Sequence, residues 1–142
     1  EARHFRLIVN RLGALGAKVD PVTFDPGRRS ALLEYLAGLA STVERVAAGQ
    51  FTREALAVVR NEEFIRFCES RGDQDTAALY RDVIQPDERH HHELGRKLLE
   101  RLAQDDESQR RAREAATRTL ELAEELQEIA RLKMGISRAP GC

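Results

Sequence analysis

The sequence predicts an all-α fold, an antiparallel bundle of helices, from its composition and its periodicity. Alanine, leucine, glutamate and arginine dominate the chain, and aromatic residues make up only 5% of it, a composition that favours helices. Apolar residues recur at steps of three and four positions, and no segment has the pattern of a β-strand. The chain has 142 residues, so we expect one helical-bundle domain over 1–142 that buries a core.

The first two helices are separated by a long connection. The first helix is expected over 1–15, with Gly16 as its stop. Pro21 and Pro26 make the stretch that follows a connection, because proline bars a helix interior. The second helix is expected over 28–48, where one seam repeats in steps of four and three: Leu32, Leu36, Leu39, Val43 and Val46.

Glycine and proline are expected to interrupt or end helices in the rest of the chain. Gly49 interrupts the second run, so 49–52 is either a tight turn or a kink in one long helix. The remaining helices are expected at 52–70, 75–103 and 106–134. Pro86 lies inside the fourth helix and is expected to kink or split it. Residues 136–142 are expected to form a frayed tail.

Charge and hydropathy exclude several classes of protein. The net charge is −1, so no basic field would recruit nucleic acid or an anionic membrane. No apolar run approaches the roughly 20 residues of a membrane span. The chain has two cysteines, Cys68 and Cys142, without a close-spaced motif, which favours a reducing, cytoplasmic location. The basic patch at Arg110, Arg111 and Arg113 is interpreted as a solvated face.

Two Glu-x-x-His pairs are the strongest chemical signal. Glu1 and His4 form the first pair, and Glu88 and His91 form the second. Three-residue spacing places both members of a pair on one face of a helix. Carboxylates with one histidine per ion suit iron or manganese, and two such pairs are half or more of the ligand set of a dinuclear carboxylate bundle. The second pair has an alternative register, Asp87 with His90, which the phase of the apolar residues does not exclude.

Two segments resemble the ligand helices of ferritin-like proteins. The resemblance is to an uncharacterised ferritin-like family and to the tRNA-modifying di-iron hydroxylases, and it covers about half of the chain. One segment is Glu1-Ala2-Arg3-His4-Phe5-Arg6-Leu7, continuing through Arg11-Leu12-Gly13-Ala14-Leu15-Gly16. The other runs from Gly72-Asp73 through Ala77-Ala78-Leu79-Tyr80 to Pro86-Asp87-Glu88-Arg89-His90-His91.

The second segment matches the family pattern in two ways. Aligned from Ala77, the family's Glu and His fall on Asp87 and His90, whereas aligned backwards from Gly95 they fall on Glu88 and His91. We prefer the latter pair, because glutamate is the commoner bridging residue.

The resemblance implies a ferritin-like antiparallel helical bundle with an added C-terminal helix. It also implies two iron (or manganese) ions and oxidase or hydroxylase chemistry, which would make the protein a di-iron oxidoreductase. The third ligand helix should supply one glutamate, for which Glu54 fits best, Glu62 second and Glu44 third. The fourth carboxylate would come from an upstream helix, and the helical pattern that is already under way at Glu1 suggests that this first helix is missing.

The sequence is also compatible with a non-catalytic helical bundle that acts as an oligomerisation or interaction module. In it the Glu-x-x-His pairs are remnants or ordinary surface pairs, and the apolar seams of the second and last helices form an interface. Either function is compatible with a homo-oligomer, most simply a dimer. No membrane partner is expected, and tRNA is a partner only by analogy with the hydroxylases.

Overall fold

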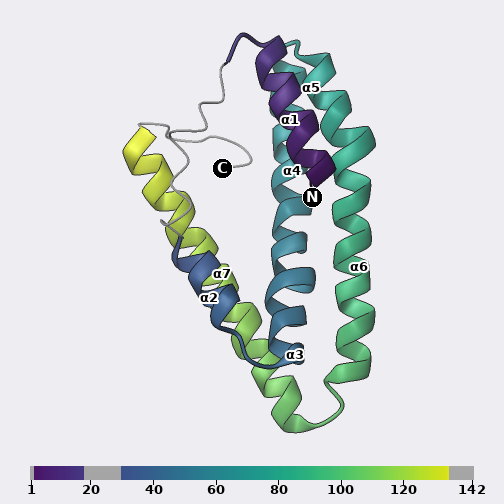
Figure 1. Ribbon diagram of the computed structural model, residues 1–142, viewed down its shortest axis with the longest axis vertical. Coiled ribbons are helices and arrows are strands. Elements are labelled where there is room, and N and C mark those ends of the chain that lie inside the picture. Colours follow the sequence, from purple (N-terminus) through teal and green to yellow (C-terminus); the bar gives the residue numbers. More distant parts are fainter. Residues whose placement is uncertain (1, 18–29, 135–142) are drawn as a thin grey trace.

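The computed structural model describes residues 2–17 and 30–134, and within them the protein is an all-α helical bundle (Figure 1), as predicted. Glu1, residues 18–29 and the expected tail at 136–142 lie outside the described residues. Three helices are not continuous with another helical segment: α1 (Ala2–Ala14), α2 (Ala31–Gly38) and α7 (Asp106–Met134). The bounds of α7 are those predicted, and α1 ends at Ala14, two residues before Gly16, whose φ is 81°.

Two long composite helices form the centre of the bundle. The first joins α3 (Thr42–Arg45), the π-helical segment η2 (Val46–Arg53) and α4 (Glu54–Ser70). The second joins α5 (Gln74–Leu79), the π-helical segment η3 (Tyr80–Ile84) and α6 (Gln85–Leu102). Gly72 turns the chain between them with a φ of 77°. As a result α4 and α6 lie side by side and antiparallel (Figure 1).

The expected second helix, over 28–48, is wrong, because the chain breaks between α2 and α3. Ser41 accepts a hydrogen bond from the backbone N–H of Glu44, and the Glu44 side chain accepts one from the backbone N–H of Ser41. This capping box starts a new helix inside the predicted one. The following stretch, 49–52, is not a tight turn, since it lies within the η2 segment of one long composite helix.

Pro86 does not split its helix. Proline lacks an N–H, and its ring clashes with the carbonyl four residues earlier in a regular α-helix. The wider turns of η3 end at Ile84, immediately before the Gln85-Pro86 start of α6. A π-helical segment opens the backbone at this point, so the helix continues through the proline.

The core is built mainly from small residues. Leu39, Ala47, Ala48 and Ala115 form one buried cluster, and α6 and α7 both pack against η2. Gly95 of α6 touches the backbone of η2, because a Cβ at this glycine would lie 2.6 Å from the carbonyl carbon of Gln50. Small side chains therefore let the central helices approach closely.

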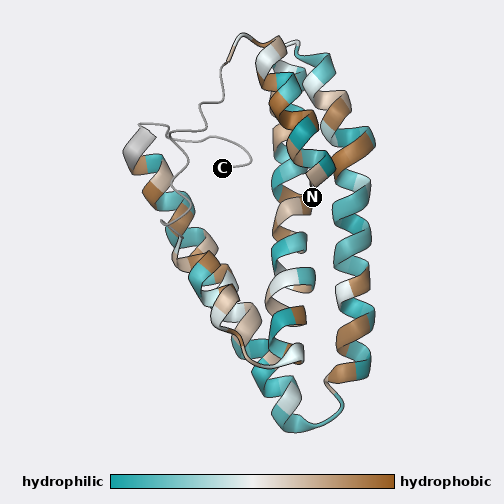
Figure 2. Cartoon of the chain, viewed as in Figure 1, coloured by the Kyte–Doolittle hydropathy of each residue, from teal (hydrophilic) through white to brown (hydrophobic). Residues whose placement is uncertain are grey.

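Long polar stretches separate the apolar clusters. The first half of α6 is hydrophilic, and its hydrophobic residues begin at Leu94 (Figure 2). Among the described helices, none combines the length and the apolar character that a bilayer span requires.

Polar contacts hold α1 to the rest of the bundle. Arg11 of α1 donates to the Thr76 hydroxyl at 2.8 Å and to the Asp73 carboxylate at 2.5 Å. Asp73 also caps α5 by accepting from the backbone N–H of Thr76. Hydrogen bonds from the hydroxyl and the backbone N–H of Thr76 lower the pKa of the Asp73 carboxyl. The Arg11 guanidinium lowers it further by a smaller amount. One buried side chain of α1, His4, then faces the long helices.

Replacing Gly95 by alanine is expected to destabilise the bundle. The added Cβ would overlap the Gln50 backbone, and forcing an extra methyl into a packed contact costs about 1–3 kcal/mol. The free energy of unfolding from urea denaturation measures the loss. Gly49→Ala is the matched control, because open space surrounds its Cβ; it should be neutral or stabilising by up to about 1 kcal/mol. Equal stabilities of Gly95→Ala and the parent would contradict the close contact.

Replacing Asp73 by asparagine is expected to lower the melting temperature in a pH-dependent way. Because the folded pKa of Asp73 is lowered, its carboxylate stabilises the fold above the ordinary carboxyl pKa, about 4. That contribution disappears as the pH falls through the lowered folded value. Melting curves should therefore show a full gap between parent and variant at pH 7 and a closing gap in acid. Asp75→Asn, whose exposed carboxylate contacts Arg11 at 3.3 Å, should leave a much smaller gap.

Candidate metal centre

Three side chains from the two long helices converge in the bundle. Glu54 is the first residue of α4, directly after η2, and Glu88 and His91 follow Pro86 on one face of α6. Ligand atoms of the three residues all lie within 4.8 Å of one another. Both carboxylates are buried, each with a relative exposure of 7%, and His91 is half-buried. A cluster with this composition could hold a metal ion.

A second imidazole reaches the same carboxylate from α1. The Nδ1 atom of buried His4 lies 3.5 Å from Oε1 of Glu88. The Nδ1 atom of His91 lies 3.5 Å from the other oxygen, Oε2. Glu88 therefore stands between two imidazoles and presents one oxygen to each of them, as a carboxylate that bridges two ions does.

Asp87 determines which nitrogen of His4 faces Glu88. His4 donates its Nε2–H to the Asp87 carboxylate at 2.8 Å, and this hydrogen bond lowers the pKa of Asp87. In the neutral ring the lone pair is then on Nδ1. This atom is buried and has no hydrogen-bond partner among the residues that the structure describes. A carboxylate–imidazole pair of this kind commonly orients a histidine ligand toward a metal.

The Glu88-to-imidazole distances and the buried charges are compatible with bound metal ions. Two ligand atoms on one ion, each about 2.1 Å from it, stand about 3–3.5 Å apart. Both Glu88-to-imidazole separations are 3.5 Å, which is too long for a good hydrogen bond. Burying Glu54 beside Glu88 is also unfavourable without a cation. Arg53 supplies part of that charge, at 3.7 Å from Glu54.

The other glutamates that the sequence offered as ligands lie elsewhere. Glu62 is exposed and accepts hydrogen bonds from Gln85 and Arg89, each at 3.3 Å. Glu44 belongs to the Ser41 capping box. Glu1 lies outside the described residues, so its predicted pairing with His4 stays a prediction.

The two registers of the second pair are separated in space. Glu88 and His91 join Glu54, whereas Asp87 bonds to His4 and His90 is exposed. The sequence suggests Asp87 only as an alternative ligand and does not predict its hydrogen bond to His4. No local pattern marks that role, because the two residues are 83 positions apart in the chain.

His92 links α6 to the segment that carries Glu54. Its Nδ1–H donates to the backbone carbonyl of Phe51 at 2.8 Å, and its ring stacks on the Phe51 ring at a centroid distance of 4.9 Å. Phe51 belongs to η2, three residues before Glu54. Each histidine of the triple run thus has a different environment.

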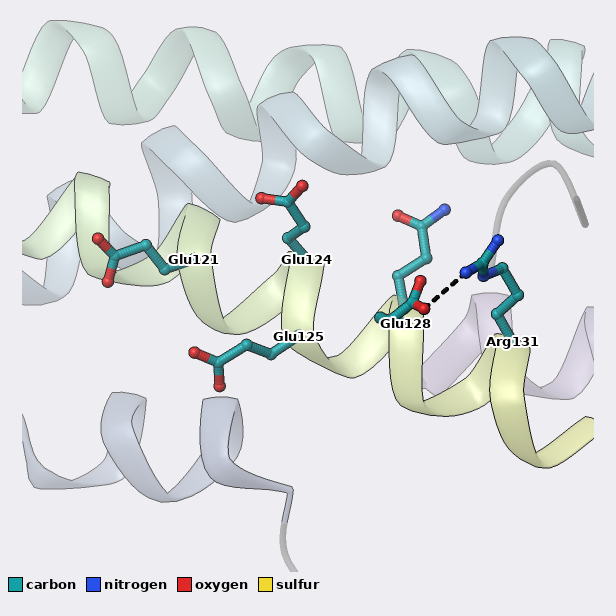
Figure 3. Close-up of a pocket in the computed structure, with 6 residues that line it drawn as sticks. Glu121, Glu124, Glu125, Glu128 and Arg131 are labelled. Carbon is teal, nitrogen blue, oxygen red and sulfur yellow. Dashed lines mark hydrogen bonds and ion pairs between the residues drawn. The ribbon is translucent and has the colours of Figure 1, made fainter. Parts of the chain in front are cut away.

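A second acidic region lies on α7, but its carboxylates do not point toward one another as those of Glu54 and Glu88 do. An open groove there is lined by Glu121, Glu124, Glu125, Gln127, Glu128 and Arg131. Its carboxylates are spread along the helix, and Glu128 pairs with Arg131 (Figure 3). Glu121 and Glu125 are both within ion-pair distance of Arg118. These groups form a solvated, internally paired face.

Comparisons with protein-family models, with curated proteins and with solved structures find no match to this chain. The chemistry of the convergent side chains is therefore the basis for a functional conclusion.

Replacing Asp87 by alanine is expected to weaken metal binding at the candidate centre. Without the carboxylate, the His4 ring loses the bond that orients its Nδ1 atom, and losses of this type reduce metal affinity about 10–100-fold. Titration with cobalt(II), followed by its visible absorption, measures the affinity. The matched control is Asp82→Ala, an exposed aspartate on the same composite helix. Equal cobalt affinities for the two variants would argue against a role of Asp87 at the centre.

Proposed function

We propose that the protein is a dinuclear metal carboxylate protein of the ferritin-like type, with iron as the metal and oxidase or hydroxylase chemistry. One observation carries the proposal: the buried Glu88 carboxylate lies between two imidazole nitrogens and presents a different oxygen to each, at 3.5 Å. A single carboxylate shared by two histidine-bearing positions is the central element of a dinuclear site.

The residues divide into two half-sites around Glu88. One half would use Glu54, Glu88 and His91, which lie within 4.8 Å of one another. The other would use His4 and Glu88, with Glu1 as the carboxylate that the sequence pairs with His4. The mixed set of oxygen and imidazole ligands suits iron and manganese, and the preference for iron follows the family resemblance.

When bound, such a pair of ions supplies redox and Lewis-acid chemistry. The chain's own residues would do the remaining work. Asp87 holds His4 in the tautomer that directs Nδ1 inward, and Glu88 and Glu54 offset the positive charge of the ions. Burial of His4, Glu54 and Glu88 restricts water at the centre. A cytoplasmic location accompanies this proposal and rests on the cysteine usage.

A specific observation favours one other function, a non-catalytic module that oligomerises. Beyond Ala123 the apolar seam of α7 presents three exposed side chains, Leu126, Ile129 and Leu132. Exposed apolar stripes of this kind are typical of interfaces. A homodimer built on α7 is compatible with either function, and sedimentation analysis measures it directly. If the protein is a dimer that binds no metal, the oligomerisation module becomes the better description.

Metal counting on the full chain tests the proposal. Protein produced with added iron should contain about two ions per chain. Glu88→Gln should lose both, because Glu88 serves both halves, whereas Glu54→Gln should affect the His91 half alone. Two matched controls replace alternative ligands: Glu62→Gln and His90→Ala should keep the parent metal content. A metal-free parent protein, or full metal retention in Glu88→Gln, would refute the proposed centre.

Glu88→Gln should show opposite stability changes without and with metal. In the metal-free protein Glu88→Gln should raise the melting temperature, because it removes one of two neighbouring buried charges. With metal present at about 1,000 times its dissociation constant, the parent should gain about 4 kcal/mol that the variant lacks.

A further inference from the structure

A cavity of about 300 Å³ lies between α1, α4 and the η3–α6 helix. One end of it is formed by His4 and Glu88, so the cavity opens directly onto the candidate metal centre. It extends from there past Ile84, one turn from Glu88, to Tyr80, two turns away. Eight helical residues correspond to about 12 Å along the axis. The metal centre therefore forms the end wall of an elongated cavity that is open to solvent along the side of the bundle, where Phe5 is exposed.

The walls of the cavity are apolar, and its far end is polar. Phe5 and Ile8 line it from α1, and Ala57 lines it from α4. Asn61 and Tyr80 form the end opposite the metal centre. Within the described part of the chain, no hydrogen bond satisfies the Asn61 side chain. Among the described lining residues none is an arginine or a lysine, so nothing in the wall would compensate an anionic ligand.

We propose that this cavity binds the substrate of the metal centre, and that the substrate is a small neutral molecule with a mainly apolar body and one hydrogen-bonding group. The volume lies at the lower end of the range for small-molecule sites. The Asn61 amide would hold the polar group, and Ile8 and Ile84 would contact the apolar body. This orientation directs the apolar end of the molecule toward His4 and Glu88. The assignment as a substrate site rests on the proposed dinuclear function, whereas the binding itself does not.

Fluorine NMR with two probes tests the cavity on the full, metal-loaded chain. 4-Fluorophenol carries an apolar ring and one hydroxyl, and fluorobenzene lacks the hydroxyl. Both probes should bind the parent. Ala57→Phe should weaken both by about tenfold or more, because the new ring occupies the cavity. Asn61→Leu should weaken 4-fluorophenol binding but not fluorobenzene binding, because only the former needs a polar partner.

Val59→Phe is the matched control for the cavity-filling variant. Val59 lies on the same helix as Ala57, and its side chain is 58% exposed. The substitution adds a large ring outside the cavity and should leave both affinities unchanged. Ala57→Leu is a milder filling variant in case Ala57→Phe does not fold. Nuclear Overhauser contacts from the bound probe to the methyl groups of Ile8 and Ile84 locate the site in the parent without any substitution.

Counting the metal in the same samples separates the two proposals. Metal-loaded parent protein that binds neither probe, or probe contacts to residues outside the cavity, would overturn the cavity inference and leave the metal centre in place. Equal probe affinities for Ala57→Leu, Val59→Phe and the parent would overturn it as well. Probe binding at Ile8 and Ile84 in a chain that holds no metal would support the binding cavity and refute the proposed function.

Discussion

The rest of the structure depends on one constraint, the burial of the Glu54 and Glu88 carboxylates beside each other. Removing a carboxylate from water costs several kcal/mol unless a positive charge compensates it. Arg53 approaches Glu54 at 3.7 Å, but Glu88 faces the His4 and His91 imidazoles. Five of the twelve buried apolar residues are alanines, so large side chains supply only part of the apolar burial that offsets this cost. A cation bound between these groups would turn the least favourable part of the bundle into a source of stability.

The π-helical segment η3 explains why the register of the second ligand pair was ambiguous in the sequence. A π-turn closes its hydrogen bond over five residues instead of four, so it takes up one extra residue. One extra residue rotates the downstream side chains by about 100° relative to a regular α-helix. Alignment from Ala77, before η3, pointed to Asp87 and His90, whereas alignment from Gly95, after η3, pointed to Glu88 and His91. The candidate ligands come after η3 in the chain. The alignment from Gly95 therefore gives the helix face on which they lie.

Helix bounds were predicted correctly where the sequence signals between neighbouring residues agreed. They were missed where two local signals conflicted, and contacts between distant residues were not predicted. The acidic start of α7 and its regular seam gave its bounds correctly, since both are properties of neighbouring residues. The break at Ser41 was missed because the seam from Leu32 to Val46 continues through it, although Ser41 and Glu44 have the spacing of a capping box. The bond between His4 and Asp87, and the cavity beyond Glu88, depend on how α1 docks. Helical periodicity contains no information about that docking.

Helix α1, which buries no apolar side chain, also completes the candidate centre. Helix α1 buries a single side chain, His4, and leaves Phe5 largely exposed, as is Leu15 directly after the helix. Polar contacts to Asp87 and Asp73 hold its two ends. Because apolar burial contributes little there, an ion shared by His4 and Glu88 would add a large fraction of the free energy that docks α1. Metal binding and closure of the cavity wall formed by Ile8 would then be one coupled event.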